Sequence, residues 1–115
     1  MNDKYTDNAK KAINYSRDIA YKLNHNYIGT EHLLIGLMEV EGVAREVLKK
    51  NGITVDKLLD LVNQLIAPNS SVQMIDAGNF TPRAKRILDR SQIEAKKFNS
   101  QKVGTEHILL ALFRE

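Results

Sequence analysis

The sequence repeats itself at an offset of 75 residues, and this repeat limits the possible folds more than any other feature. Residues 5–40 align with residues 80–115 without a gap, and 13 of the 36 pairs are identical. The longest identical block reads Gly-Thr-Glu-His, at 29–32 and again at 104–107. Solenoid repeats have periods of roughly 20 to 50 residues, so this longer offset predicts two copies of one small helical unit.

The first copy, residues 5–67, is predicted to hold four helices, because its apolar residues recur at intervals of three and four. Three threonines precede these apolar stretches at the place where a helix N-cap is expected: Thr6, Thr30 and Thr54. The third helix is expected over 43–50, where Gly52 ends it by taking the left-handed conformation at little cost.

The second copy, residues 80–115, is predicted to begin with Thr81 as N-cap and Pro82 at the first helical position. Residues 68–79 have the composition of a linker between the copies. Counterparts of residues 41–67 are missing after the second copy. The predicted fold is therefore all-α: a tandem pseudo-twofold repeat of a four-helix unit, with the second repeat truncated after its second helix.

This missing part predicts that the chain is a piece of a longer protein and that its last apolar face is uncovered. The residues of that face are Ile108, Leu109, Leu112 and Phe113. Exposed apolar faces favour association, so a dimer formed by exchange of elements is one expectation.

Composition limits the class of protein. The 115 residues are enough for one domain, 1–115, and no apolar run approaches the roughly 18 residues of a transmembrane helix. The polar start, MNDKYTDNAKK, does not resemble a signal peptide, and the chain has no cysteine. We therefore expect a cytoplasmic protein without membrane contact. The net charge of +3 is uneven, since residues 68–115 hold eight basic and five acidic residues.

Glu31 and Glu106 have a structural and a functional interpretation. Each follows its predicted N-cap directly, at N1, where a carboxylate stabilises the helix dipole by roughly 0.3 to 1 kcal/mol. If the copies pack about a pseudo-twofold axis, however, each glutamate lies near the first helix start of the other copy, beside Thr6 or Thr81. Helix N-termini bind phosphate, and carboxylates bind guanidinium. A phosphorylated arginine has both groups on one side chain.

The histidines do not predict a metal site. His32 and His107 each follow a glutamate directly, and adjacent residues on a helix do not share a face. We expect each imidazole to hydrogen-bond a backbone carbonyl and so fix the second helix of its copy. His25 is absent from the second copy and is expected on the surface.

Both copies resemble the N-terminal domain of the Clp-type AAA+ unfoldases. The resemblance covers essentially the whole chain and is greatest to the ClpC branch of Gram-positive bacteria, through YTDNAKKAI, NYIGTEHLLIGLMEVEGVA, FTPRAKRIL and KVGTEHILLALFRE. It implies a pseudo-twofold bundle of eight helices that sits on an ATP-driven ring, receives adaptor proteins and substrates, and delivers them for unfolding and degradation. This chain departs from that pattern by ending within the second repeat.

The resemblance also implies a ligand. Domains of the ClpC type receive phosphoarginine-marked proteins, and the glutamates of the two blocks contact the guanidinium, which maps this role onto Glu31 and Glu106. Phosphate-side contacts are implied for four further residues: Thr6, Thr81, Lys4 and Arg83. No cofactor is implied.

Three other functions compete with this one. A nucleic-acid module is suggested by a basic helical stripe (Arg83, Arg86, Arg90 and Lys97), but +3 is a weak charge for duplex binding. A docking module for adaptors, without a phosphoarginine pocket, is compatible with the main interpretation. An enzyme is disfavoured, because the sequence has no Walker A pattern and no nucleophile and base at a usable spacing.

Overall fold

The computed structural model describes residues 4–65 and 80–114, of which 61–65 are described by their backbone only. Within these residues the regular structure is entirely helical, apart from two isolated backbone bridges. The helices are α1 (Asp7–Lys22), α2 (Thr30–Glu39), α3 (Val43–Lys50), α4 (Val55–Leu65), α5 (Pro82–Lys97) and α6 (Thr105–Arg114). The predicted all-α class is confirmed, whereas the predicted linker, 68–79, lies outside the described residues.

The starts of the first helices follow the sequence prediction. The hydroxyl of Thr6 accepts the amide of Ala9 at 3.1 Å, and the hydroxyl of Thr81 accepts the amide of Ala84 at 3.0 Å. Each bond satisfies one of the free amides at a helix start. Pro82 occupies the first turn of α5, where its missing N–H is not needed.

The first helices also end alike. Asn24 and Asn99, which are aligned in the repeat, have φ of 61° and 58° and so turn the chain after α1 and α5. The amide of His25 then donates to the carbonyl of Ala20 at 2.9 Å, and an equivalent bond closes α5. This is a Schellman motif, and in each copy it turns the backbone after the first helix toward the Gly-Thr-Glu-His block.

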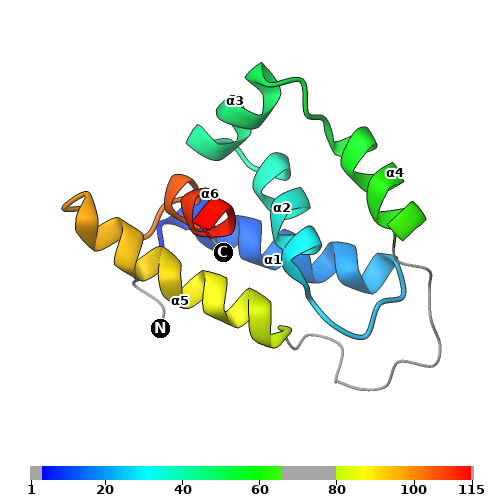
Figure 1. Ribbon diagram of the computed structural model, residues 1–115, viewed down its shortest axis with the longest axis horizontal. Coiled ribbons are helices and arrows are strands. Elements are labelled where there is room, and N and C mark those ends of the chain that lie inside the picture. Colours follow the sequence, from blue (N-terminus) through cyan, green and yellow to red (C-terminus); the bar gives the residue numbers. More distant parts are fainter. Residues whose placement is uncertain (1–3, 66–79, 115) are drawn as a thin grey trace.

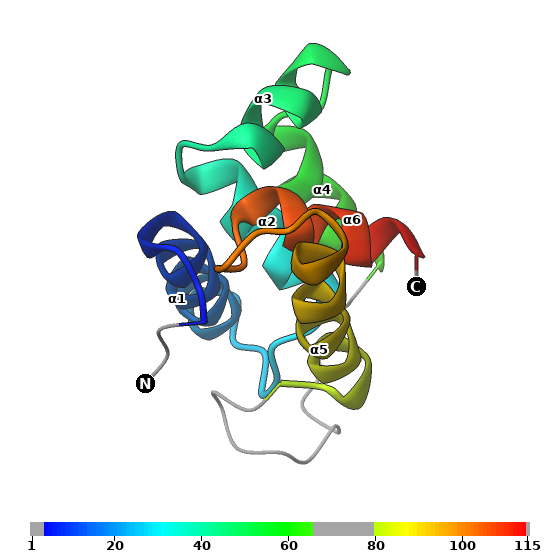
Figure 2. The ribbon, with the colours of Figure 1, turned by 90° about the vertical axis from the view of Figure 1, so that its left-hand side faces the viewer.

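The two helix pairs are related by a pseudo-twofold arrangement. Tyr5 forms a parallel bridge with Val103, and Ile28 forms the corresponding bridge with Phe80. In Figure 2 the orange loop before α6 lies beside the dark blue start of α1, and the cyan loop before α2 lies beside the yellow-green start of α5. Each copy therefore begins against the loop of the other.

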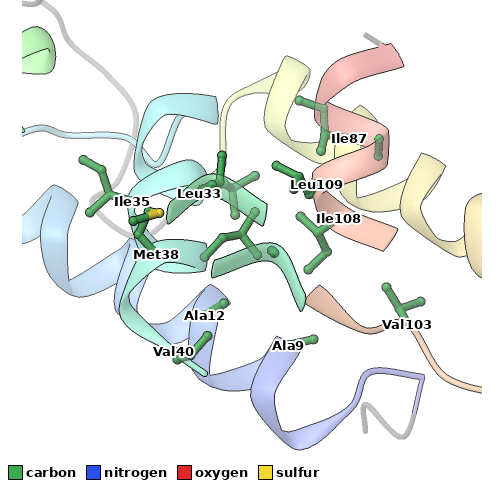
Figure 3. Close-up of a cluster of buried hydrophobic side chains, with 14 of the residues drawn as sticks. Ala9, Ala12, Leu33, Ile35, Met38, Val40, Ile87, Val103, Ile108 and Leu109 are labelled. Carbon is green, nitrogen blue, oxygen red and sulfur yellow. The ribbon is translucent and has the colours of Figure 1, made fainter. Parts of the chain in front are cut away.

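A single apolar core joins the copies (Figure 3). Residues of both second helices are fully buried in it, including Leu33, Ile35 and Ile108. The expectation that Ile108 and Leu109 lie on an uncovered face is wrong, because α6 turns both toward this core. Phe113, in contrast, is 68% exposed.

Helices α3 and α4 both pack against α2, and α3 also reaches α6 (Figure 1). Gly36 lets α2 approach α1 closely, because the carbonyl of Ala12 occupies the space that a Cβ would need. Ser16, buried at this crossing, donates to the carbonyl of Ile13 at 2.5 Å, so its hydroxyl has a partner inside the core.

One buried charge breaks the similarity of the copies. Glu94 on α5 occupies the position that Ile19 occupies on α1, and its side chain is fully buried. Arg114 lies 2.7 Å from its carboxylate, and Arg90 lies 3.7 Å away. A buried carboxylate requires such partners, so the end of α6 is tied to the last turn of α5 by charge.

Candidate functional site

Backbone hydrogen bonds hold each Gly-Thr-Glu-His block against the helix start of the other copy. The amide of Thr6 donates to the carbonyl of Val103 at 2.9 Å, and the amide of Val103 donates to the carbonyl of Lys4 at 2.6 Å. On the other side, the amide of Thr81 donates to the carbonyl of Ile28 at 3.0 Å. The inferred juxtaposition of each block with the partner copy is therefore present in the fold.

The blocks cap their own helices through histidine, not through threonine. The ring Nδ1 of His32 accepts the amide of Gly29 at 2.8 Å, and Nδ1 of His107 accepts the amide of Gly104 at the same distance. The predicted N-cap Thr30 is wrong, since Gly29 is the cap and Thr30 is already helical. The predicted bond from each imidazole to a backbone carbonyl is also wrong, because the partner is an amide.

Both glutamates consequently stand at N2, not at N1, and fold back over their own cap. A Cβ on Gly29 would lie 2.6 Å from Oε1 of Glu31, and a Cβ on Gly104 would lie 2.6 Å from Oε1 of Glu106. Gly29 has an ordinary φ of −100°, so glycine is needed there for space and not for its backbone freedom. The glycine of the motif makes room for the carboxylate.

His25 is not on the surface as predicted: it is 6% exposed, and its Nδ1 lies 2.7 Å from Nε2 of His32. Because Nδ1 of His32 accepts the amide of Gly29, the proton of His32 belongs on Nε2, from which it donates to His25. Burial and the neighbouring His25 lower the pKa of His32 to about 4. Burial also lowers the pKa of His25, although Glu31 opposes this. This chain of rings exists only in the first copy.

A cavity of about 550 Å³ lies where the second block meets the start of α1. Its lining combines Thr6 and Asn8 from the first copy with Lys102 and Glu106 from the second. The starts of α1, α3 and α6 all contribute, since Gly42 and Val43 line it as well. Positive helix ends, a carboxylate and an ammonium group thus surround one space.

Thr105 fixes the junction of α3 and α6 beside this cavity. Its hydroxyl is buried and lies 3.5 Å from the amide of Ala44, which donates to it. Gly42 has φ of 156°, and a Cβ there would lie 2.6 Å from Oγ1 of Thr105. The second residue of the block therefore holds α3 in place instead of capping α6.

The Glu31 side has different neighbours. The hydroxyl of Tyr27 hydrogen-bonds the carboxylate of Glu31, and the pKa of Tyr27 is raised, first by burial and then by this carboxylate. The rings of Tyr27 and His25 are stacked, with 5.4 Å between their centres, so His25 packs against one face of the tyrosine ring. Glu31 therefore has a donor within its own copy, whereas Glu106 forms no hydrogen bond or ion pair with the described residues.

The flanking cations fall in places that the sequence prediction only partly anticipated. The backbone of Lys4 bonds to the loop before α6, but its exposed side chain is not part of the cavity lining. Arg83 is exposed in the first turn of α5, two residues after Thr81. Lys102, which lines the cavity, was not among the predicted residues. The repeat alignment offers a signal for it, since this lysine stands opposite the uncharged Tyr27.

Other chemistry has little support in the described part of the chain. The basic stripe of α5 is interrupted, because Arg90 is half-buried and directed toward Glu94. In residues 4–65 and 80–114 no group of three histidine, aspartate or glutamate side chains is placed to hold a metal ion. Over the same residues, no helix combines the length and the apolar character of a membrane span.

Known proteins share both the sequence and the fold. Residues 4–115 match the family described as "Clp repeat (R) N-terminal domain". The chain is 44% identical over 111 residues to the ATP-dependent Clp protease ATP-binding subunit ClpC of Staphylococcus aureus, and 44% identical to that of Staphylococcus epidermidis. These alignments cover 96% of this chain but only 13% of either relative.

Solved structures agree. The N-terminal domain of ClpD from Arabidopsis thaliana superposes with a TM-score of 0.78 at 26% identity, over 96% of this chain and 75% of that one. The N-domain of ClpV from Vibrio cholerae superposes with a TM-score of 0.76 at 20% identity, over 96% and 67%. The match over nearly the whole sequence, together with this shared fold, shows that the chain belongs to the Clp repeat N-terminal domain family and is similar to the N-terminal region of ClpC.

Proposed function

We propose that this domain receives proteins marked with phosphoarginine and adaptor proteins, and passes them to the ATP-driven unfoldase ring of a longer parent chain. Two pseudo-symmetric sites take part, one formed by Glu106 with Thr6 and one formed by Glu31 with Thr81. The domain itself acts without catalysis and without a cofactor, and its place is the cytoplasm. The family and the 44% identity to ClpC support the general role.

The chemistry of the cavity supports the ligand. A phosphoarginine side chain has an anionic phosphoryl group attached to a planar, cationic guanidinium. The positive ends of α1, α3 and α6, whose first residues line the cavity, suit the phosphoryl group. The carboxylate of Glu106, which has no partner among the described residues, suits the guanidinium through paired, charge-assisted hydrogen bonds.

One observation supports this proposal more than any other: the carboxylate of one copy and the threonine-capped helix start of the other copy line the same cavity. A glutamate whose only task was to stabilise its own helix dipole would not need a neighbour from the opposite copy. The bonds of Val103 to Thr6 and Lys4 hold that neighbour in register.

Calorimetry with free phosphoarginine tests the proposal. The double variant Glu31→Ala and Glu106→Ala is expected to lose binding altogether, while its helical content by circular dichroism stays unchanged. A control, Glu39→Ala and Glu41→Ala, removes the same charge from two exposed positions of the first copy and is expected to bind normally. Unchanged affinity in the first double variant would refute the assignment.

Adaptor docking without phosphoarginine is the second candidate, and a specific surface favours it. A groove of about 370 Å³ between α1 and α5 is lined by apolar residues, including Ile13, Phe80 and Leu88, and by the cations Lys10 and Arg17. The guanidinium of Arg17 lies 5.6 Å from the ring centre of Phe80. A ClpV N-domain, whose fold is similar, has been solved in complex with a VipB peptide.

Peptides separate the two candidates. Matched peptides with phosphoarginine and with plain arginine would bind equally if docking alone operates, and only the phosphorylated peptide would bind tightly if the phosphoarginine sites operate.

A further inference from the structure

The two sites differ in which element carries the cationic side chain. In the repeat alignment Lys102 stands opposite Tyr27, and Arg83 stands opposite Asn8. Because the copies cross, Lys102 and Asn8 share the Glu106 site, and Tyr27 lies beside Glu31. Arg83 follows Thr81, whose amide bonds to the loop before Glu31, so the alignment assigns it to the Glu31 side. The aligned cation of the Glu106 site is thus on its loop, and that of the Glu31 side is on the opposing helix start.

Lys102 is positioned to act on a ligand. It lines the cavity with Thr6 and Glu106, two residues before the cap Gly104. Its ammonium group forms no ion pair and no hydrogen bond with the described residues, and in particular it does not pair with Glu106. An exposed, unpaired ammonium group beside the amides of three helix starts strengthens the attraction for an anion.

The equivalent position of the Glu31 site has a different effect. Tyr27 carries no charge, and its hydroxyl already binds the carboxylate of Glu31. A guanidinium that enters this site must share or displace that hydrogen bond. At the Glu106 site no such internal donor competes among the described residues.

We propose that Lys102 is the phosphate-binding cation of the Glu106 site, that Arg83 is its counterpart at the Glu31 site, and that the Glu106 site binds phosphoarginine more tightly. This inference rests on the proposed function. It differs from the sequence-based assignment, which gave Lys4 the role of charge donor beside Thr6. The charge of each site is thus set by a residue that the repeat does not preserve.

Amide resonances can report on each site separately. The amide of Gly104 lies in the Glu106 site and the amide of Gly29 in the Glu31 site, and each is held by its own histidine. In a titration of the whole 115-residue chain with phosphoarginine, we expect the Gly104 signal to give the lower dissociation constant.

Two substitutions that exchange aligned residues test the assignment. Lys102→Tyr is expected to raise the dissociation constant reported by Gly104 about tenfold, the usual effect of losing one charge-assisted hydrogen bond, and to leave the Gly29 value unchanged. Arg83→Asn is expected to do the reverse. Lys97→Ala, which removes an exposed charge at the end of α5, is expected to change neither. Lys102→Gln serves as a second variant that retains a long polar side chain.

The outcomes are distinct. If the wild-type chain shows no shift at either glycine, the proposed function itself fails. If the wild-type chain binds but both Lys102 variants retain the Gly104 value, or lose affinity equally at both glycines, the role of Lys102 is overturned. Plain arginine gives a further check, since its weaker binding should not depend on Lys102.

Discussion

The first and second copies use the same four-residue block in two different surroundings. In both, histidine caps the helix and glycine makes room for a folded-back glutamate. Around Glu31, however, Tyr27 and the buried His25 complete a network within the copy. Around Glu106 a cavity opens that Lys102 and Thr6 line. The block therefore holds a carboxylate in one position, and the residues around it determine which groups the carboxylate can contact.

The largest expected difference concerns the capping histidines. His32→Ala should lower the free energy of unfolding by about 4 kcal/mol, because it leaves the buried amide of Gly29 and the ring of His25 without a partner and opens a void. His107→Ala should cost less, about 3 kcal/mol, since His107 has no histidine partner. Urea unfolding of both variants checks this. An equal or larger loss for His107→Ala would contradict the difference between the copies.

The helix crossings give the next contrast. Gly36→Ala should destabilise the chain by about 3 kcal/mol, because the new methyl group would collide with the backbone of Ala12. The aligned residue of the second copy is Ala111, which is fully buried. Ala111→Gly should cost only about 1 to 2 kcal/mol, through helix propensity and lost burial. Thermal unfolding measures both, and similar losses would show that the two crossings are equally close.

A smaller effect separates binding from stability. Gly104→Ala places a methyl group where Oε1 of Glu106 lies, and the flexible carboxylate swings away. We expect the Glu106 site to lose about tenfold in affinity for phosphoarginine, with a change in unfolding free energy within about 1 kcal/mol, the cost of alanine at an N-cap. Calorimetry and urea unfolding measure the two quantities. Full affinity in this variant would show that the position of the carboxylate is not critical.

The smallest effect is a dependence on pH that arises from the histidines of the first copy. The pKa of His32 is about 4 in the folded chain and 6.5 as the reference value, so the unfolded chain takes up protons first and stability falls as pH drops from 6.5 toward 4. His25→Ser introduces the residue that the second copy has at the aligned position, Ser100, and removes a charge beside His32. It should reduce the loss of stability between pH 7 and pH 4 by about 1 kcal/mol. Urea midpoints at the two pH values measure it; identical losses would contradict it.

The sequence predicted those parts of the molecule that depend on local rules. Thr6 and Thr81 cap their helices as expected, and the 75-residue repeat correctly indicated a pseudo-twofold helical fold. The packing of each copy against the other was also expected, because two similar apolar faces can bury each other about a pseudo-twofold axis.

The errors arose where a distant residue changes a local preference. Threonine is a common N-cap, but the hydroxyl of Thr105 accepts the amide of Ala44 at the start of α3 instead. The buried imidazole of His107 accepts the amide of the cap residue Gly104. His25 was placed on the surface because its burial depends on the turn after α1 and on the ring of His32. Lys102 was not predicted to line a site, because the repeat alignment shows its charge but only the folded chain shows that its loop faces the other copy.

The most direct test is whether one ligand contacts both copies at once. In a titration of the wild-type chain with phosphoarginine followed by amide resonances, the signals of Thr6 and Asn8 should move together with those of Gly104 and Glu106, with one shared dissociation constant. Movement of the second-copy signals while Thr6 and Asn8 stay still would show that the site is not built across the two copies.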